Sequence, residues 1–206
     1  LPAAGLGLLY PDLHGNYAEK CLFGLQLEIL NARALTKGII GVHIMFALPN
    51  FADMVRTSIS AQVDVIFAGA GLPLDLPSYL SKESTTHLVP IVSSSRAAKL
   101  ICDKWKTNYG YLPDAIVVEG PKAGGHLGFK NDQIEDEHYA LEQLIPDVVS
   151  VAKSYAEHKE IPVIAAGGIS TGEDIARFMS LGASAVQMGS IFVHTDECDA
   201  AVEFKK

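Results

Sequence analysis

Short apolar runs recur along the chain, and helix-compatible stretches separate most of them. The runs begin near Gly5, Ile39, Val63, His87, Asp114, Ile161 and Ala185. Valine, isoleucine and alanine dominate these runs with almost no polar alternation, which is typical of strands buried on both faces. Most intervals between the runs are long enough for one strand and one helix. The pattern therefore predicts parallel strands joined by helices.

Two of these runs, close to the C-terminus, end in small residues. The run from Ile161 ends in Gly167-Gly168, and the run from Ala185 leads into Gly189-Ser190. In (β/α)8 barrels, the loops after the last two strands commonly bind phosphate through backbone N–H groups. We therefore expect a (β/α)8 barrel, with a doubly wound open sheet as the alternative. Because only seven strands can be counted, we expect one barrel domain over residues 1–206 that lacks its first strand and is incomplete at both ends.

The predicted helices carry signals for their ends. Ser170 and Glu173 have the spacing of a capping box, and Gly182 is placed as a left-handed residue that ends a helix. Another helix is expected over residues 51–62, with Asn50 as its N-cap.

The composition favours a compact cytoplasmic domain. Of the 206 residues, 49% are hydrophobic and 19% are charged, and the formal net charge is −8. The negative charge and the scattered Lys and Arg argue against a nucleic-acid partner. No apolar stretch is long enough to cross a membrane. The three cysteines are far apart and the histidines lack paired spacing, so we expect reduced thiols and no metal site.

Residues 119–128 are the most informative segment for chemistry. Their sequence, Glu119-Gly-Pro-Lys-Ala-Gly-Gly-His-Leu-Gly, follows directly on an apolar run. Glycines without a Cβ allow the main chain to approach a ligand closely. His126 lies among them, and an imidazole can orient an anion or accept a proton near neutral pH. We expect His126 to be catalytic, with a surface histidine as the plainer alternative.

Three motifs, in this order and spacing, resemble the nitronate monooxygenase family, formerly called 2-nitropropane dioxygenases. They are the 119–128 loop, Val163-Ile-Ala-Ala-Gly-Gly-Ile and Gln187-Met-Gly-Ser. The likeness covers nearly the whole chain. Ala3-Ala-Gly-Leu-Gly resembles the second strand of the family, Gly41-Val-His-Ile the third and Phe67-Ala-Gly-Ala-Gly the fourth.

The resemblance implies a (β/α)8 barrel that binds FMN without a covalent bond. By position, Gly124 and Glu119 would lie along the flavin, and His126 would face the substrate. The ribityl phosphate would be bound by Gly168, Gln187, Met188, Gly189 and Ser190. His43, where the family usually has Asn, is a candidate flavin contact.

The resemblance also implies a reaction, the oxidation of an alkyl nitronate by oxygen to a carbonyl compound and nitrite. Glu119 stands where many members have Gln, a change shared with the related flavin-dependent enoyl-acyl-carrier-protein reductases. An NAD(P)H-dependent reductase of an enoyl thioester or quinone is therefore an alternative. A degenerate flavin- or phosphate-binding barrel without activity is a third. The physiological substrate, the nucleotide preference and the oligomeric state stay open.

Residues 132–138 include four acidic residues, directly after the His126 loop. Such a run is usually a solvated loop or a helix start. Its place in the chain also makes it a candidate lid over the active site.

Overall fold

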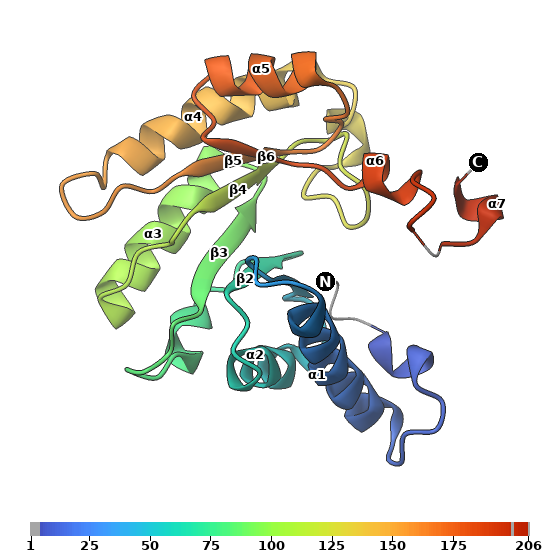
Figure 1. Ribbon diagram of the computed structural model, residues 1–206. Coiled ribbons are helices and arrows are strands. Elements are labelled where there is room, and N and C mark those ends of the chain that lie inside the picture. The colour runs from blue at the N-terminus through green and yellow to red at the C-terminus, as the bar shows by residue number, and fades with distance from the viewer. Residues whose placement is uncertain (1–4, 199, 206) are drawn as a thin grey trace. The chain divides into compact units, whose positions relative to one another are not determined.

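The computed structural model describes residues 5–198 and 200–205 (Figure 1). Its strands are β1 (Gly41–Met45), β2 (Val65–Gly69), β3 (His87–Val92), β4 (Ile116–Glu119), β5 (Val163–Ala166) and β6 (Ala185–Gln187). Its α-helices are α1 (Tyr17–Leu35), α2 (Phe51–Ser60), α3 (Ser95–Tyr109), α4 (Leu141–Lys153), α5 (Gly172–Ser180), α6 (Ser190–Val193) and α7 (Val202–Lys205). Short 3-10 helices lie at Leu6–Leu9, Leu76–Tyr79, Asn131–Gln133 and Glu137–Tyr139.

The chain divides into two compact units. The first comprises Leu1–Ile91 and Lys99–Ala115, and the second comprises Val92–Ala98 and Ile116–Lys206. Both units alternate strands with helices, as the sequence predicts. The expected single barrel domain stays a prediction.

In the first unit, β1, β2 and β3 pair in parallel in the order of the sequence. Val42 and Ile44 of β1 are buried, whereas His43 between them is exposed. Successive residues of a strand point to opposite faces, so His43 lies on the face opposite to these two core residues. The register places His43 directly beside Phe67 of β2.

The expected strand near Gly5 is wrong, because the described part of that segment, Leu6–Leu9, is a 3-10 helix. The reason is close packing against α1. A Cβ on Gly7 would lie 2.9 Å from the Cys21 nitrogen, and a Cβ on Gly24 would lie 2.8 Å from the Leu6 carbonyl oxygen. Gly7 of this motif and Gly24 of α1 therefore allow the backbone of Leu6–Leu9 to lie directly against α1. Ala3 and Ala4 of the same motif lie outside the described residues.

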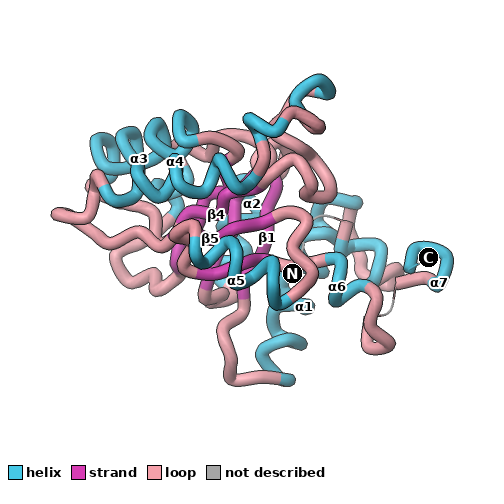
Figure 2. The backbone as a smooth tube through the Cα atoms, turned by 90° about the horizontal axis from the view of Figure 1, so that it is seen from above, coloured by secondary structure: helices cyan, strands magenta, loops and turns pink. Residues whose placement is uncertain are grey.

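In the second unit, β4, β5 and β6 also pair in parallel in sequence order. Helix α4 packs on β4 and β5, and α5 packs on β6 (Figure 1). Figure 2 shows β5 leading through a loop into α5. A doubly wound sheet requires the strand order to reverse. Neither unit reverses its strand order, which favours the barrel.

The start of α5 differs by one residue from the predicted capping box. Thr171 is the N-cap, and its hydroxyl oxygen accepts a bond from the Asp174 nitrogen at 3.1 Å. The Asp174 carboxylate accepts bonds from the Ser170 and Thr171 nitrogens at 3.1 and 3.0 Å. Ser170 and Glu173 are therefore wrong as the capping pair. Thr171 is the N-cap because the carboxylate of its partner, Asp174, binds the backbone donors of Ser170 and Thr171 at once.

Two other helix ends were predicted. Gly182 follows α5 with φ +103°, so the predicted left-handed glycine at that end is confirmed. Asn50 does stand at the N-cap of α2, but its side chain makes no capping hydrogen bond. Helix α2 ends at Ser60, which is two residues earlier than expected.

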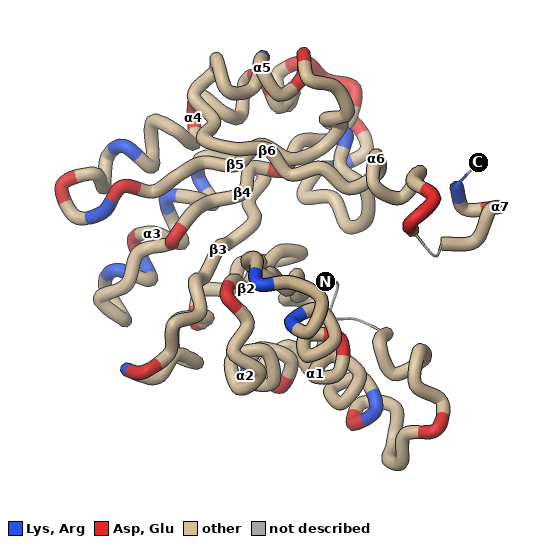
Figure 3. The backbone as a smooth tube through the Cα atoms, in the orientation of Figure 1, with Lys and Arg blue, Asp and Glu red and all other residues tan. Residues whose placement is uncertain are grey.

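Charged residues are scattered along the described chain (Figure 3). Acidic residues are continuous over Glu135–Glu137, in the segment before α4. Among the described residues, no helix combines the length and apolar character needed to cross a membrane. Within those same residues, no group of three His, Cys, Asp or Glu is arranged to hold a metal ion.

Replacing Asp174 with Ala is expected to lower the free energy of unfolding at neutral pH, because Ser170, Thr171 and Arg177 lose their acceptor. Hydrogen bonds from the Ser170 backbone and from Thr171 lower the pKa of Asp174 to about 2. A lowered carboxyl pKa stabilises the fold above the unfolded-state value, and this stability is lost as the pH falls through the folded value.

Urea unfolding between pH 7 and pH 3 checks this expectation. The difference in the free energy of unfolding between wild type and Asp174→Ala should become smaller as the pH falls. Glu173→Ala is the matched control, because Glu173 is the neighbouring exposed carboxylate and should change little. An equal effect of the two substitutions would contradict the assignment of the cap.

Candidate functional site

Three residues at the ends of neighbouring strands form a row in the second unit. The register pairs Glu119 of β4 with Ala166 of β5, and Ala166 with Gln187 of β6. Paired residues of neighbouring strands share a face, and neighbouring strands lie about 4.8 Å apart. Glu119 and Gln187 therefore point from the same face with only the small Ala166 between them. Two of the predicted site residues are thus brought together.

Glu119 is half-buried at the last position of β4. A Cβ on the next residue, Gly120, would lie 2.9 Å from the Leu141 side chain of α4, so Glu119 points to the opposite face from α4. Burial raises the pKa of the Glu119 carboxyl. This carboxyl makes no hydrogen bond or ion pair with any described residue. A raised pKa at the end of a strand is typical of functional carboxyls, although burial alone also produces it.

The loop after β5 packs directly on the loop after β4. The Gly120 nitrogen donates to the Ala166 carbonyl oxygen at 3.0 Å. Gly167 has φ +104°, and a Cβ there would lie 3.0 Å from the Ala123 nitrogen. Gly168 has φ +72°, and a Cβ there would lie 2.9 Å from the Lys122 Cβ. The two glycines are needed both for their left-handed backbone and for this close approach.

The remaining glycines of the predicted site face open space. A Cβ added to Gly124 or Gly189 would meet no atom within 4 Å. Within the described residues, the backbone nitrogens of Gly168, Gly189 and Ser190 donate no hydrogen bond. Free donors beside empty space fit an oxyanion such as a flavin phosphate. The residues present therefore fit the predicted group.

The helix termini beside these loops offer little positive charge. The first turn of α5 holds two carboxylates, Glu173 and Asp174, and Asp174 accepts bonds from the Ser170 and Thr171 nitrogens just before the helix. Helix α6 has only four residues, so its macrodipole is small. A phosphate at these loops would depend on free loop amides and on nearby side-chain charge.

His126 is exposed and lies directly after Gly125, which has φ +85°. Its imidazole makes no hydrogen bond or ion pair in the part of the chain that the structure describes. The ring is therefore free to meet a ligand. Its catalytic role stays a prediction.

His43 lies in the first unit, whereas the other predicted site residues lie in the second. Its ring is exposed on one side, yet the surrounding strands withdraw enough water to lower the pKa of His43. The neutral ring is therefore favoured. Its contact with flavin stays a prediction.

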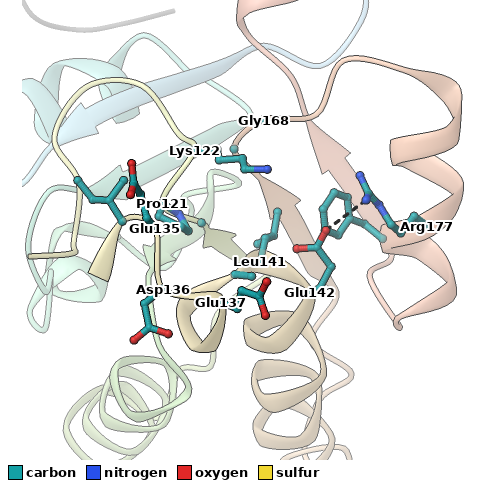
Figure 4. Close-up of a pocket in the computed structure, with 14 residues that line it drawn as sticks. Pro121, Lys122, Glu135, Asp136, Glu137, Leu141, Glu142, Gly168 and Arg177 are labelled. Carbon is teal, nitrogen blue, oxygen red and sulfur yellow. Dashed lines mark ion pairs between the residues drawn. The ribbon is translucent and has the colours of Figure 1, made fainter. Parts of the chain in front are cut away.

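A cavity of about 400 Å³ opens in the second unit, beside the loops after β4 and β5 (Figure 4). Of the predicted site residues, only Gly168 lines it. Lys122 lies next to Gly168, and an ion pair between Arg177 and Glu142, at 3.4 Å, lies across the cavity. The sequence analysis missed these three residues. Lys122 could have been noticed as a cation inside the glycine loop.

The acidic segment predicted as a candidate lid forms one wall of this cavity, through Ile134, Glu135, Asp136 and Glu137. Asp136 is engaged locally, because it accepts bonds from the backbone nitrogen and from the ring of His138 at 2.9 and 2.8 Å. The segment therefore borders the cavity. Whether it acts as a lid stays a prediction.

Two solved structures resemble the described fold closely. FabK from Thermotoga maritima superposes with a TM-score of 0.72 at 32% identity, over 89% of this chain and 51% of that chain. Nitroalkane oxidase from Streptomyces ansochromogenes superposes with a TM-score of 0.73 at 23% identity, over 89% of this chain and 59% of that one. These similarities confirm the (β/α)8 class, of which the described residues contain six parallel strands.

Comparison of the sequence with known proteins agrees with the structural similarities. The nitronate monooxygenase family matches residues 22–206. Proteins named "Probable nitronate monooxygenase" from Staphylococcus aureus and Staphylococcus saprophyticus are 32% and 35% identical, over 73% and 75% of this chain. The matches cover 39% and 40% of those proteins, so this chain spans less than half of their length. The chain belongs to the nitronate monooxygenase family, whose members are oxidoreductase enzymes.

Proposed function

We propose that this chain is part of an FMN-dependent oxidoreductase that oxidises alkyl nitronates with oxygen to carbonyl compounds and nitrite. The row of Glu119, Ala166 and Gln187, which leads into the open glycine loops, is the observation that carries the proposal. It agrees with family membership over residues 22–206. Cytoplasmic location, like the absence of a nucleic-acid partner, stays an expectation from composition.

The flavin phosphate is assigned to the backbone nitrogens of Gly168, Gly189 and Ser190. These donors are free in the described chain, and they follow residues that pair across β5 and β6. Gln187 and Met188 complete the loop. Gly124 offers open space beside the flavin, and Glu119 points from the same face as Gln187. The contact of His43 with flavin is proposed from the family resemblance alone.

Bound FMN supplies the electron transfer, and the protein supplies orientation and acid–base groups. His126 is proposed to hold the negative nitronate oxygens as an imidazolium, or to remove the α-proton of a neutral nitroalkane as an imidazole. Its exposure among glycines leaves room for a substrate at the ring.

The second candidate is an NAD(P)H-dependent flavin reductase acting on an enoyl thioester or a quinone. Glu119 favours it, because the same change from Gln occurs in the related enoyl-acyl-carrier-protein reductases. The 32% identity to FabK points in the same direction. A barrel that binds flavin or phosphate without activity is the non-enzyme alternative.

Anaerobic mixing of the FMN-loaded protein with a nitronate, NADH and NADPH in turn separates these functions. Bleaching of the flavin absorbance by nitronate alone is the expected result. Bleaching by a pyridine nucleotide would favour the reductase. A colourless protein that takes up no added FMN would contradict both enzyme functions.

Substituting Gly189 by Val is expected to abolish FMN binding, because the side chain would occupy the open space assigned to the phosphate. The fold should survive, since no protein atom lies within 4 Å of a Cβ there. Flavin content after purification and the thermal unfolding temperature are the two measurements. Unchanged flavin occupancy would overturn the phosphate assignment.

We compare the free energy of unfolding of flavin-free wild type with that of Glu119→Gln. The variant should become more stable relative to wild type as the pH rises from 4 to 7. Burial raises the pKa of Glu119. The stability that the protonated carboxyl contributes is therefore complete below the unfolded-state pKa and is lost as the pH rises through the folded-state pKa. Gln does not titrate. Urea unfolding across this range checks the trend, and a pH-independent difference between the two proteins would contradict it.

Removing the imidazole by His126→Ala is expected to lower turnover of a neutral nitroalkane by roughly 10² to 10⁴, the usual contribution of a positioned general base. Turnover of preformed nitronate should fall by a smaller factor, because its α-proton is already removed. FMN content should not change. His158→Ala, at another exposed histidine, is the control. Wild-type turnover of the neutral nitroalkane by His126→Ala would exclude a role in proton removal.

A further inference from the structure

The loops assigned to the flavin phosphate have few sources of positive charge. The first turn of α5 carries the negative charges of Glu173 and Asp174, and α6 has only four residues. Arg177, on α5, is paired with both Asp174 and Glu142. A phosphate dianion is bound more strongly where a cation stands nearby. A cation that strengthens phosphate binding at these loops would come from another residue.

Lys122 is placed to do so. It follows β4, and its stem lies against Gly168, with its Cβ and Cδ 2.9 and 3.1 Å from the position of an added Cβ on that glycine. Figure 4 shows the lysine extending beside Gly168. The contact joins a cationic side chain directly to the loop that carries one of the assigned phosphate donors.

The ammonium group of Lys122 is available for a ligand. It is exposed and makes no ion pair or hydrogen bond with the described residues. Four carboxylates line the same cavity, but Glu142 is paired with Arg177 and Asp136 with His138, and none of the four pairs with Lys122: Glu135, Asp136, Glu137 and Glu142. A solvated ammonium without a fixed partner keeps its charge for an incoming anion.

We propose that Lys122 is a specificity-determining residue that makes this loop prefer phosphorylated flavin over riboflavin. The inference rests on the proposed FMN site. The aliphatic stem holds Gly168 in its left-handed conformation, and the ammonium attracts the phosphate bound to the neighbouring amides. The charge acts on FMN alone, because riboflavin carries no phosphate. The stem acts on both ligands.

Substitutions that separate stem from charge test the proposal. Lys122→Met keeps an unbranched apolar side chain and removes the charge. Lys122→Ala removes both. A charge a few ångströms from a phosphate near the surface contributes on the order of a threefold to thirtyfold change in affinity. Lys122→Met should lower the affinity for FMN by that factor and leave the affinity for riboflavin unchanged. Quenching of flavin fluorescence on titration with protein measures both affinities.

Three further measurements make the test specific. Lys122→Arg keeps the charge and should restore the preference for FMN. Lys153→Met changes the net charge equally at the far end of α4, about 18 Å from its start, and should have no effect. The FMN advantage of the wild type should shrink as salt rises, because the attraction is screened.

If Lys122→Met lowers the affinities for FMN and riboflavin by the same factor, the inference is overturned, since the residue would then only shape the loop. Unchanged affinities for both flavins in Lys122→Met would also overturn it. If the wild type binds riboflavin and FMN equally well, Lys122 confers no preference and the inference fails while flavin binding stands. If the wild type binds neither flavin, the proposed function fails together with it.

Discussion

The close approach of two backbone loops determines the geometry of the candidate site. Gly167 places its chain so close to Ala123 and Gly120 that an added Cβ would lie only 3.0 to 3.2 Å from them, and the Gly120 nitrogen donates to the Ala166 carbonyl oxygen. This contact fixes the loop after β5 relative to the loop after β4. Donors and charged groups from both loops therefore meet at one position. A larger residue at position 167 would separate the loops before it affected any ligand.

The site that results depends more on loop amides and side-chain charge than on helix dipoles. The Asp174 carboxylate binds the Ser170 and Thr171 nitrogens just before α5, which stabilises that helix but places a negative charge in its first turn. The same carboxylate also holds Arg177. The carboxylate that stabilises α5 therefore opposes an anion there, whereas Lys122, which lies against Gly168, makes no ion pair with the described residues.

Much of this arrangement was predictable from sequence because it depends on local rules. Strands β5 and β6 were visible as apolar runs ending in glycine, and Gly182 was visible as a helix end. The prediction at Gly5 was wrong because Gly7 and Gly24 serve a helix contact, which depends on residues far apart in the chain. The capping pair was missed by one residue because Ser170 and Thr171 both satisfy the spacing. The position of Lys122 against Gly168 could not be predicted, since it follows from the packing of two loops.

The central claim is that flavin phosphate binds at the amides after β5 and β6, and not against the α4 and α5 residues of the cavity that Gly168 also lines. Amide nuclear magnetic resonance spectra of the ¹⁵N-labelled protein, recorded with FMN and then with riboflavin, test it most directly. The account predicts that the amide signals of Gly168, Gly189 and Ser190 differ most between the two ligands. The largest differences at Leu141, Glu142 and Phe178, which line the cavity, would contradict it.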